Sequence, residues 1–171
     1  LHLREDRRHI QDQDIFDLRP IVNQMNFECA TSDEIIEIAL KIKPEWICIV
    51  PEKREELTTE GGLNLSNDNS NLKSTIKRLT SANINVSLFI NPDQESVKIS
   101  KDLGANGIEI HTGIYSLADN KETSLTDIKQ CASLGNQFGL KVQAGHGLNY
   151  ENIHDIAKIP EIVEEIGRAH V

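Results

Sequence analysis

Segments typical of strands and of helices alternate along the 171 residues, and this alternation predicts an α/β fold. No two neighbouring strand segments are joined by a hairpin turn, so the sheet is expected to be parallel. Polar residues stand at the carboxyl end of nearly every predicted strand, which favours a (β/α)8 TIM barrel over an open doubly wound sheet. A whole barrel needs about 250 residues, so the sequence predicts part of one.

Each predicted strand is a short apolar segment bounded by polar or turn-forming residues. In order along the chain, the predicted strands are residues 1–3, 25–30, 46–51, 86–90, 107–113 and 141–145. The third is apolar throughout, which is typical of a strand buried on both faces. The last runs into Gly145-His146-Gly147, where the two glycines leave room for a ligand to approach the backbone.

Each predicted helix has apolar side chains at helical spacing and a recognisable beginning or end. In order, the predicted helices are residues 12–22, 32–42, 72–79, 93–103, 125–138 and 149–158. Pro20 should shorten the first, Thr31 or Ser32 should cap the second, and Asn149 should cap the last. The polar loop 52–71 is long for a compact α/β unit, and such loops are usually functional or disordered.

The predicted barrel is incomplete at both ends. We expect the chain to run from the end of the second barrel strand through the seventh helix, with residues 1–164 forming a partial barrel domain. Residues 165–171 match the translation of a common sequencing adapter, so we expect them to be a non-native tail. Without its first and last strands a barrel has two unpaired edges, so we expect this chain by itself to fold poorly and to be inactive.

Composition excludes several functional classes. The net charge of −9 argues against nucleic acid as a general partner. No apolar run approaches the roughly 18 residues of a membrane span, and the charged opening residues do not resemble a signal peptide. The three cysteines, Cys29, Cys48 and Cys131, are odd in number and far apart, so we expect buried free thiols and a cytoplasmic protein.

Ionisable residues gather at the predicted strand ends, and in a barrel they would face one pocket. They are His2, Arg4, Glu28, Glu109, His111 and His146. Histidines and environment-tuned glutamates exchange protons near neutral pH, so this set predicts general acid–base catalysis. The same set could hold a divalent metal, and a metal-dependent hydrolase using His2, His111, His146 and a glutamate stays open as an alternative. Arg7 and Arg8 are expected to be a solvated charge run.

Five blocks of sequence, in register from His2 to about Glu164, resemble pyridoxine 5′-phosphate synthase. The blocks are residues 2–10, 25–28, 50–54 with 58–63, 108–113 and 144–148. The resemblance implies a (β/α)8 barrel that condenses 1-deoxy-D-xylulose 5-phosphate with 3-amino-2-oxopropyl phosphate. The products would be pyridoxine 5′-phosphate, phosphate and water, in vitamin B6 biosynthesis. It also implies a transferase-type synthase with no metal or organic cofactor, acting as a homo-oligomer.

The resemblance assigns roles to particular residues. His2 and Glu28 would be proton acceptors, His146 a proton donor, and Glu109 a group that stabilises a transition state. The implied substrate contacts are Arg4, His9 and Thr58 for the deoxyxylulose phosphate and Gly147 for the amino ketone phosphate. The loop 52–71 would cover the site and exclude water. A barrel that keeps Arg4 and His9 but binds phosphate without catalysis is a further alternative.

Overall fold

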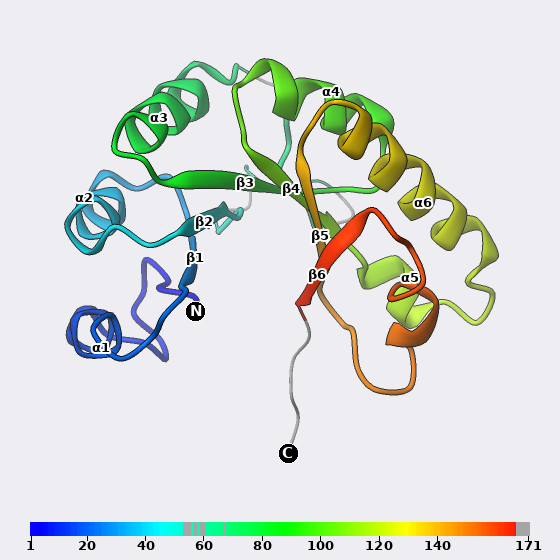
Figure 1. The fold of residues 1–171 in the computed structure, drawn as a ribbon, viewed down its shortest axis with the longest axis horizontal. Coiled ribbons are helices and arrows are strands. Elements are labelled where there is room, and N and C mark those ends of the chain that lie inside the picture. The colour runs from blue at the N-terminus through cyan, green and yellow to red at the C-terminus, as the bar shows by residue number, and fades with distance from the viewer. Residues whose placement is uncertain (53–55, 57, 59–60, 67, 167–171) are drawn as a thin grey trace.

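The structure, a computed structural model, describes residues 1–52, 56, 58, 61–66 and 68–166. Its six strands form one parallel sheet in sequence order. They are β1 Asn26–Cys29, β2 Trp46–Ile49, β3 Asn85–Ile90, β4 Gly107–His111, β5 Lys141–Gly145 and β6 Ile162–Ile166. The sheet curls into a half-barrel with helices along its outer side (Figure 1). The parallel α/β prediction is confirmed, and the curl is compatible with a partial TIM barrel.

The helices begin and end largely where local chemistry predicts. They are α1 Asp12–Leu18, α2 Asp33–Ile42, α3 Ser70–Ser81, α4 Gln94–Asp102, α5 Gly113–Leu117, α6 Glu122–Gln137 and the short 3-10 helix η2 Ile153–Asp155. Helix α1 stops two residues before Pro20, as expected. The Ser32 hydroxyl accepts a hydrogen bond from the Ile35 N–H at 3.4 Å, which caps α2. The α5 helix was not predicted.

The two faces of the sheet differ in composition, because alternate residues of a strand point to opposite sides. The outer face joins the main apolar core with Phe27, Cys29, Ile47, Ile49, Val86, Leu88, Ile108, Ile110, Val142 and Ala144. The residues between them line the inner face: Glu28, Cys48, Ser87, Phe89, Glu109 and Gln143. Cys48, Val50 and Phe89 form a separate small apolar cluster. The outer face therefore holds the fold together, and the inner face is left for polar chemistry.

The helix predicted for residues 149–158 is wrong. The Asn149 side chain accepts hydrogen bonds from the backbone N–H groups of Glu151 at 2.9 Å and Asn152 at 3.1 Å. The Asn152 side chain in turn accepts from the Asn149 N–H at 2.8 Å. These side chains satisfy the backbone in a turn instead of a helix, and only η2 follows.

Strand β6 was also not predicted, because two of its five residues are glutamates and most of its side chains are not buried. It pairs parallel to β5, with an irregularity in register between Val142 and Gln143. Strand β6 crosses the expected boundary between residues 164 and 165, and residues 167–171 lie outside the described residues. That residues 165–171 are a non-native tail stays a prediction, which resequencing the end of the gene would test.

The cysteine prediction is confirmed, because Cys29, Cys48 and Cys131 are all free and buried. Within the described part of the chain, no helix is both long and apolar enough to cross a membrane.

Candidate active site

The inner face begins with His2, which lies beside Glu28 of β1. Residues 1–3 run parallel to β1: the Leu3 N–H donates to the Glu28 carbonyl at 3.2 Å, and the Glu28 N–H donates to the Leu1 carbonyl at 2.8 Å. This pairing places the two side chains side by side, with His2 Nδ1 3.4 Å from Glu28 Oε2. The two predicted proton acceptors are therefore neighbours.

A second carboxylate, Glu52, lies on the other side of the His2 ring. Glu52 Oε1 is 3.0 Å from His2 Nε2, and Glu52 Oε2 accepts the Glu5 N–H at 2.8 Å. Only 10% of the Glu52 side chain is exposed. Glu52 was not among the predicted site residues, although it follows an apolar strand just as the other candidates do.

Glu109 is a buried carboxyl in the middle of the inner face. It is 3% exposed, and the Cys48 thiol donates a hydrogen bond to its Oε2 at 3.2 Å. Burial, and then repulsion by Glu28, raises the pKa of Glu109 to about 8. A Cβ on Gly145 would collide with Glu109 Oε1, so the glycine leaves room for the carboxyl in the position it occupies. Glu109 is therefore protonated at neutral pH and can donate a hydrogen bond.

Two imidazole rings lie together at the ends of β4 and β5. The ring centroids of His111 and His146 are 4.7 Å apart, and Phe89 meets His111 edge-on at 5.1 Å. Burial, with repulsion from His146, lowers the pKa of His111 to about 4, so His111 is neutral near pH 7. Its Nδ1 is buried without a hydrogen-bond partner among the described residues.

His146 is held in an unusual backbone conformation. Its φ of 83° lies in the left-handed region, which costs a residue other than glycine about 1–3 kcal/mol. The Thr112 hydroxyl donates to the His146 carbonyl at 2.7 Å, which helps to hold this geometry. Gly147 follows at φ 78°, and a Cβ there would meet Ser116 at 2.8 Å. In this conformation the His146 side chain lies exposed at the end of β5.

The predicted contacts to the deoxyxylulose phosphate lie on loops. Arg4 and His9 are exposed on the segment that follows His2. Thr58 is tied to the end of β3, because the Asn91 side-chain amide donates to its hydroxyl at 2.8 Å. The contacts to phosphate stay predictions. So does closure of loop 52–71, which falls partly on residues outside the described ranges.

The neighbouring arginines were expected to be a solvated charge run, which describes Arg8, whereas the Arg7 side chain is only 18% exposed and is held by ion pairs. Arg7 binds Asp12 at 2.7 Å and Glu34 at 2.6 Å, and Arg8 lies 3.2 Å from Asp6. These ion pairs hold the loop after His2 in place.

The metal-hydrolase alternative finds little support in this geometry. Among the described residues, no group of three or more histidine, cysteine, aspartate or glutamate side chains is placed to hold a metal ion. His2 is flanked by Glu28 and Glu52, whereas His111 and His146 form a separate pair. The three histidines named for that alternative therefore do not make a common ligand set.

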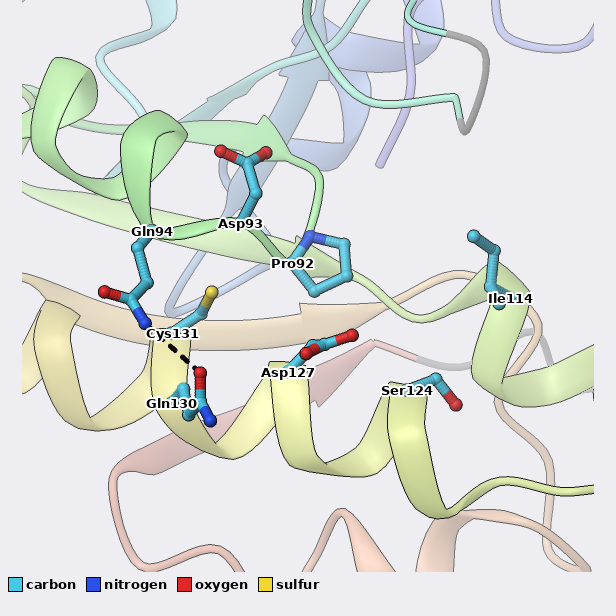
Figure 2. A pocket seen from close by; sticks show the side chains of 8 residues that line it. All are labelled: Pro92, Asp93, Gln94, Ile114, Ser124, Asp127, Gln130 and Cys131. Atoms are coloured by element: carbon cyan, nitrogen blue, oxygen red, sulfur yellow. Dashed lines mark hydrogen bonds between the residues drawn. The ribbon is translucent and has the colours of Figure 1, made fainter.

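A hollow of about 490 Å³ lies elsewhere, between the start of α4 and the helix α6 (Figure 2). It is lined by Pro92, Asp93, Gln94, Ile114, Ser124, Asp127, Gln130 and Cys131. The lining includes two aspartates and no basic side chain, so it does not suit a phosphorylated ligand. The paired histidines and carboxyl groups described above lie on the inner face of the sheet instead.

The family model described as pyridoxal phosphate biosynthesis protein PdxJ matches residues 1–171. The chain belongs to the PdxJ family. The resemblance inferred from five sequence blocks is thus confirmed, and PdxJ membership makes the chain part of a biosynthetic enzyme.

Curated relatives of this PdxJ chain agree with the assignment. It is 49% identical over 168 residues to pyridoxine 5′-phosphate synthase of Aliivibrio fischeri, covering 96% of this chain and 69% of the relative. It is 52% identical over 162 residues to the synthase of Thermodesulfovibrio yellowstonii, covering 93% and 67%. It is 47% identical over 173 residues to the synthase of Prochlorococcus marinus, covering 99% and 71%.

The structure brings some of the candidate PdxJ site residues together and leaves others apart. His2 contacts Glu28, and the charge of Glu28 raises the pKa of Glu109. Gly145, which precedes His146, packs against Glu109. Within the described part of the chain, the side chains of Arg4 and His9 are exposed and make no hydrogen bond or ion pair with these groups. Sequence reasoning missed the contacts made by Glu52, Cys48 and Asn91.

Proposed function

We propose that this PdxJ chain carries the acid–base residues of a pyridoxine 5′-phosphate synthase. The enzyme would condense 1-deoxy-D-xylulose 5-phosphate with 3-amino-2-oxopropyl phosphate, releasing phosphate and water. One observation supports this most strongly: a single face of the sheet carries a histidine between two carboxylates and a buried carboxyl that holds its proton at neutral pH. Successive condensation and dehydration steps require both groups that accept protons and groups that donate them.

The proposed roles follow from these environments. Glu28 and His2, which are neighbours on the inner face, together accept the protons that the reacting carbon and nitrogen atoms release. Neutral Glu109 donates a hydrogen bond to an oxygen on which negative charge develops. His146, exposed at the end of β5, gives a proton to a leaving oxygen.

The substrate phosphates would bind at the rim of the half-barrel. We infer that Arg4, His9 and Thr58 hold the deoxyxylulose phosphate, because a guanidinium and a hydroxyl both donate hydrogen bonds to phosphate oxygens. The Gly147 N–H would serve the amino ketone phosphate, since glycine lets the backbone come close to it. We also infer that the half-barrel is part of a closed (β/α)8 barrel.

The test uses two proteins: the 171-residue chain, and an extended chain in which it is joined to the terminal segments of the T. yellowstonii relative. Both are mixed with the two phosphates, and pyridoxine 5′-phosphate is followed by its absorbance, with and without EDTA. We expect the extended chain to form product equally well with the chelator. A folded extended chain that binds the phosphates without product would support the binding-barrel alternative, and loss of product with EDTA would contradict the metal-free site.

We further infer a cytoplasmic homo-oligomer. Three free, buried cysteines suit a reducing compartment. The oligomeric state comes from the family resemblance alone, and light scattering on the extended chain would test it.

A further inference from the structure

The position of Glu52 suggests a role for a residue to which neither the sequence nor the relatives' names assign one. Its two carboxylate oxygens are both engaged: Oε1 by His2 Nε2 at 3.0 Å, and Oε2 by the Glu5 N–H at 2.8 Å. The backbone bond from Glu5 fixes the direction of the carboxylate. The His2 backbone is fixed too, by its ladder to β1. The imidazole therefore meets Glu52 in one orientation.

This orientation decides which ring nitrogen carries a proton. Both ring nitrogens face carboxylates, and a carboxylate only accepts hydrogen bonds, so the single proton of a neutral ring belongs on the nitrogen with the closer contact. That contact is the hydrogen bond between Nε2 and Glu52 Oε1 at 3.0 Å. In neutral His2 the proton is then on Nε2, and the lone pair is on Nδ1. Nδ1 is the nitrogen that lies 3.4 Å from Glu28 Oε2. The ring thus presents its basic atom to the second proposed proton acceptor.

We propose that Glu52 is a positioning residue that fixes His2 as the Nε2–H tautomer, so that Nδ1 exchanges a proton with Glu28. When Glu28 has taken a proton from substrate, its O–H bond breaks and an N–H bond forms at His2 Nδ1. Glu28 becomes a carboxylate again, and His2 becomes an imidazolium whose new charge faces the Glu52 carboxylate. The reverse transfer returns the proton. The same logic underlies buried carboxylates that orient catalytic histidines in other enzymes.

This proposal rests on the proposed function for its consequence, but the tautomer itself belongs to the free protein. The first measurement is therefore a two-bond ¹H–¹⁵N correlation spectrum of the extended chain labelled with ¹⁵N-histidine, with His2 assigned by its loss in His2→Gln. We expect the Nε2–H pattern in the wild-type protein and a mixture of tautomers in Glu52→Gln, because an amide can present either its oxygen or its NH₂ group to Nε2. An Nδ1–H pattern in the wild type overturns the proposal.

The second measurement is steady-state kinetics of the same variants. We expect Glu52→Gln to lower kcat at least tenfold with KM changed less than twofold, and Glu52→Asp to recover part of kcat because it keeps the charge. Glu45→Gln is the matched control. Like Glu52, Glu45 accepts one hydrogen bond from a side chain and one from a backbone N–H, here from Arg19 and Met25 at 2.8 Å each, but it lies at the other end of the sheet. It should leave kcat and the His2 spectrum unchanged.

The outcomes separate the two hypotheses. If Glu52→Gln retains kcat within twofold, or if Glu45→Gln lowers kcat as much, Glu52 has no special role and the proposal fails. If the wild-type extended chain shows the Nε2–H tautomer but makes no product, the proposed function fails and the role of Glu52 in setting the tautomer stands. If Glu52→Gln does not fold, the wild-type spectrum and Glu52→Asp still decide, because Glu52→Asp must keep the Nε2–H pattern.

Discussion

Replacing Glu109 by glutamine should make the free energy of unfolding less sensitive to pH. Burial, and then the charge of Glu28, raises the pKa of Glu109 to about 8, against an ordinary value of 4.5. Below about pH 4.5 the carboxyl is protonated in both the folded and the unfolded chain. Between about 4.5 and 8 the unfolded chain releases this proton and the folded chain keeps it, so the wild-type protein loses stability as pH rises through this window.

The size of this loss can be set from the two pKa values. Each pKa unit corresponds to about 1.4 kcal/mol, so the interval from 4.5 to about 8 gives an upper limit of roughly 5 kcal/mol. Relaxation and water penetration around the ionised carboxylate reduce this limit, and we expect about 3 kcal/mol. Glutamine keeps the size of the side chain and can accept the Cys48 hydrogen bond, so Glu109→Gln should gain this amount over the wild type between pH 4.5 and 9.

Urea unfolding followed by circular dichroism, at several pH values from 4.5 to 9, measures the difference between the two proteins. Other titrating groups are common to both and largely cancel. Glu151→Gln, at an exposed position, is the control and should run parallel to the wild type. If the wild-type and Glu109→Gln stabilities also ran parallel across this range, Glu109 would be ionised and solvated in the folded protein, and the argument from its burial would be refuted.

Three further predictions test the inner face. Cys48→Ala removes the thiol that donates a hydrogen bond to Glu109, so the pKa of Glu109 should rise and the loss of stability should extend to a higher pH. The same urea series measures this, and an unchanged pH range would mean that the thiol does not influence the carboxyl. Gly145→Ala should cost about 1–3 kcal/mol in unfolding free energy and lower kcat, because its Cβ would collide with Glu109, and unchanged stability and kcat would contradict this. His146→Gly should abolish turnover while leaving the unfolding free energy unchanged or raised by about 1 kcal/mol, since the φ of 83° favours glycine; retained turnover would remove His146 from the reaction.

The sequence predicted the repeating elements and the positions of the inner-face groups, because both depend on local pattern. Glu28, Glu109 and His146 lie where polar residues in or just after apolar strands were expected. The contacts between these groups could not be predicted in the same way. His2 and Glu52 are 50 residues apart in sequence, and only the parallel sheet brings them to 3.0 Å.

Misassigned elements have equally physical causes. In the 149–158 segment, asparagine side chains satisfy the backbone locally, and the capping residue that suggested a helix makes a turn instead. Strand β6 lacks the apolar alternation of its neighbours, since its identity as a strand comes from hydrogen bonds to β5 and not from its own side chains. Tertiary pairing overrode local pattern at both places.

The division of each strand between two faces limits how members of this family can vary in length. Inserting or deleting one residue inside β4 would carry Glu109 into the apolar layer beneath the helices and turn Ile108 or Ile110 toward the reacting groups. Such a change would damage folding and chemistry at once. Gaps between related sequences should therefore fall in the connecting segments, and the strands of the half-barrel should align without them.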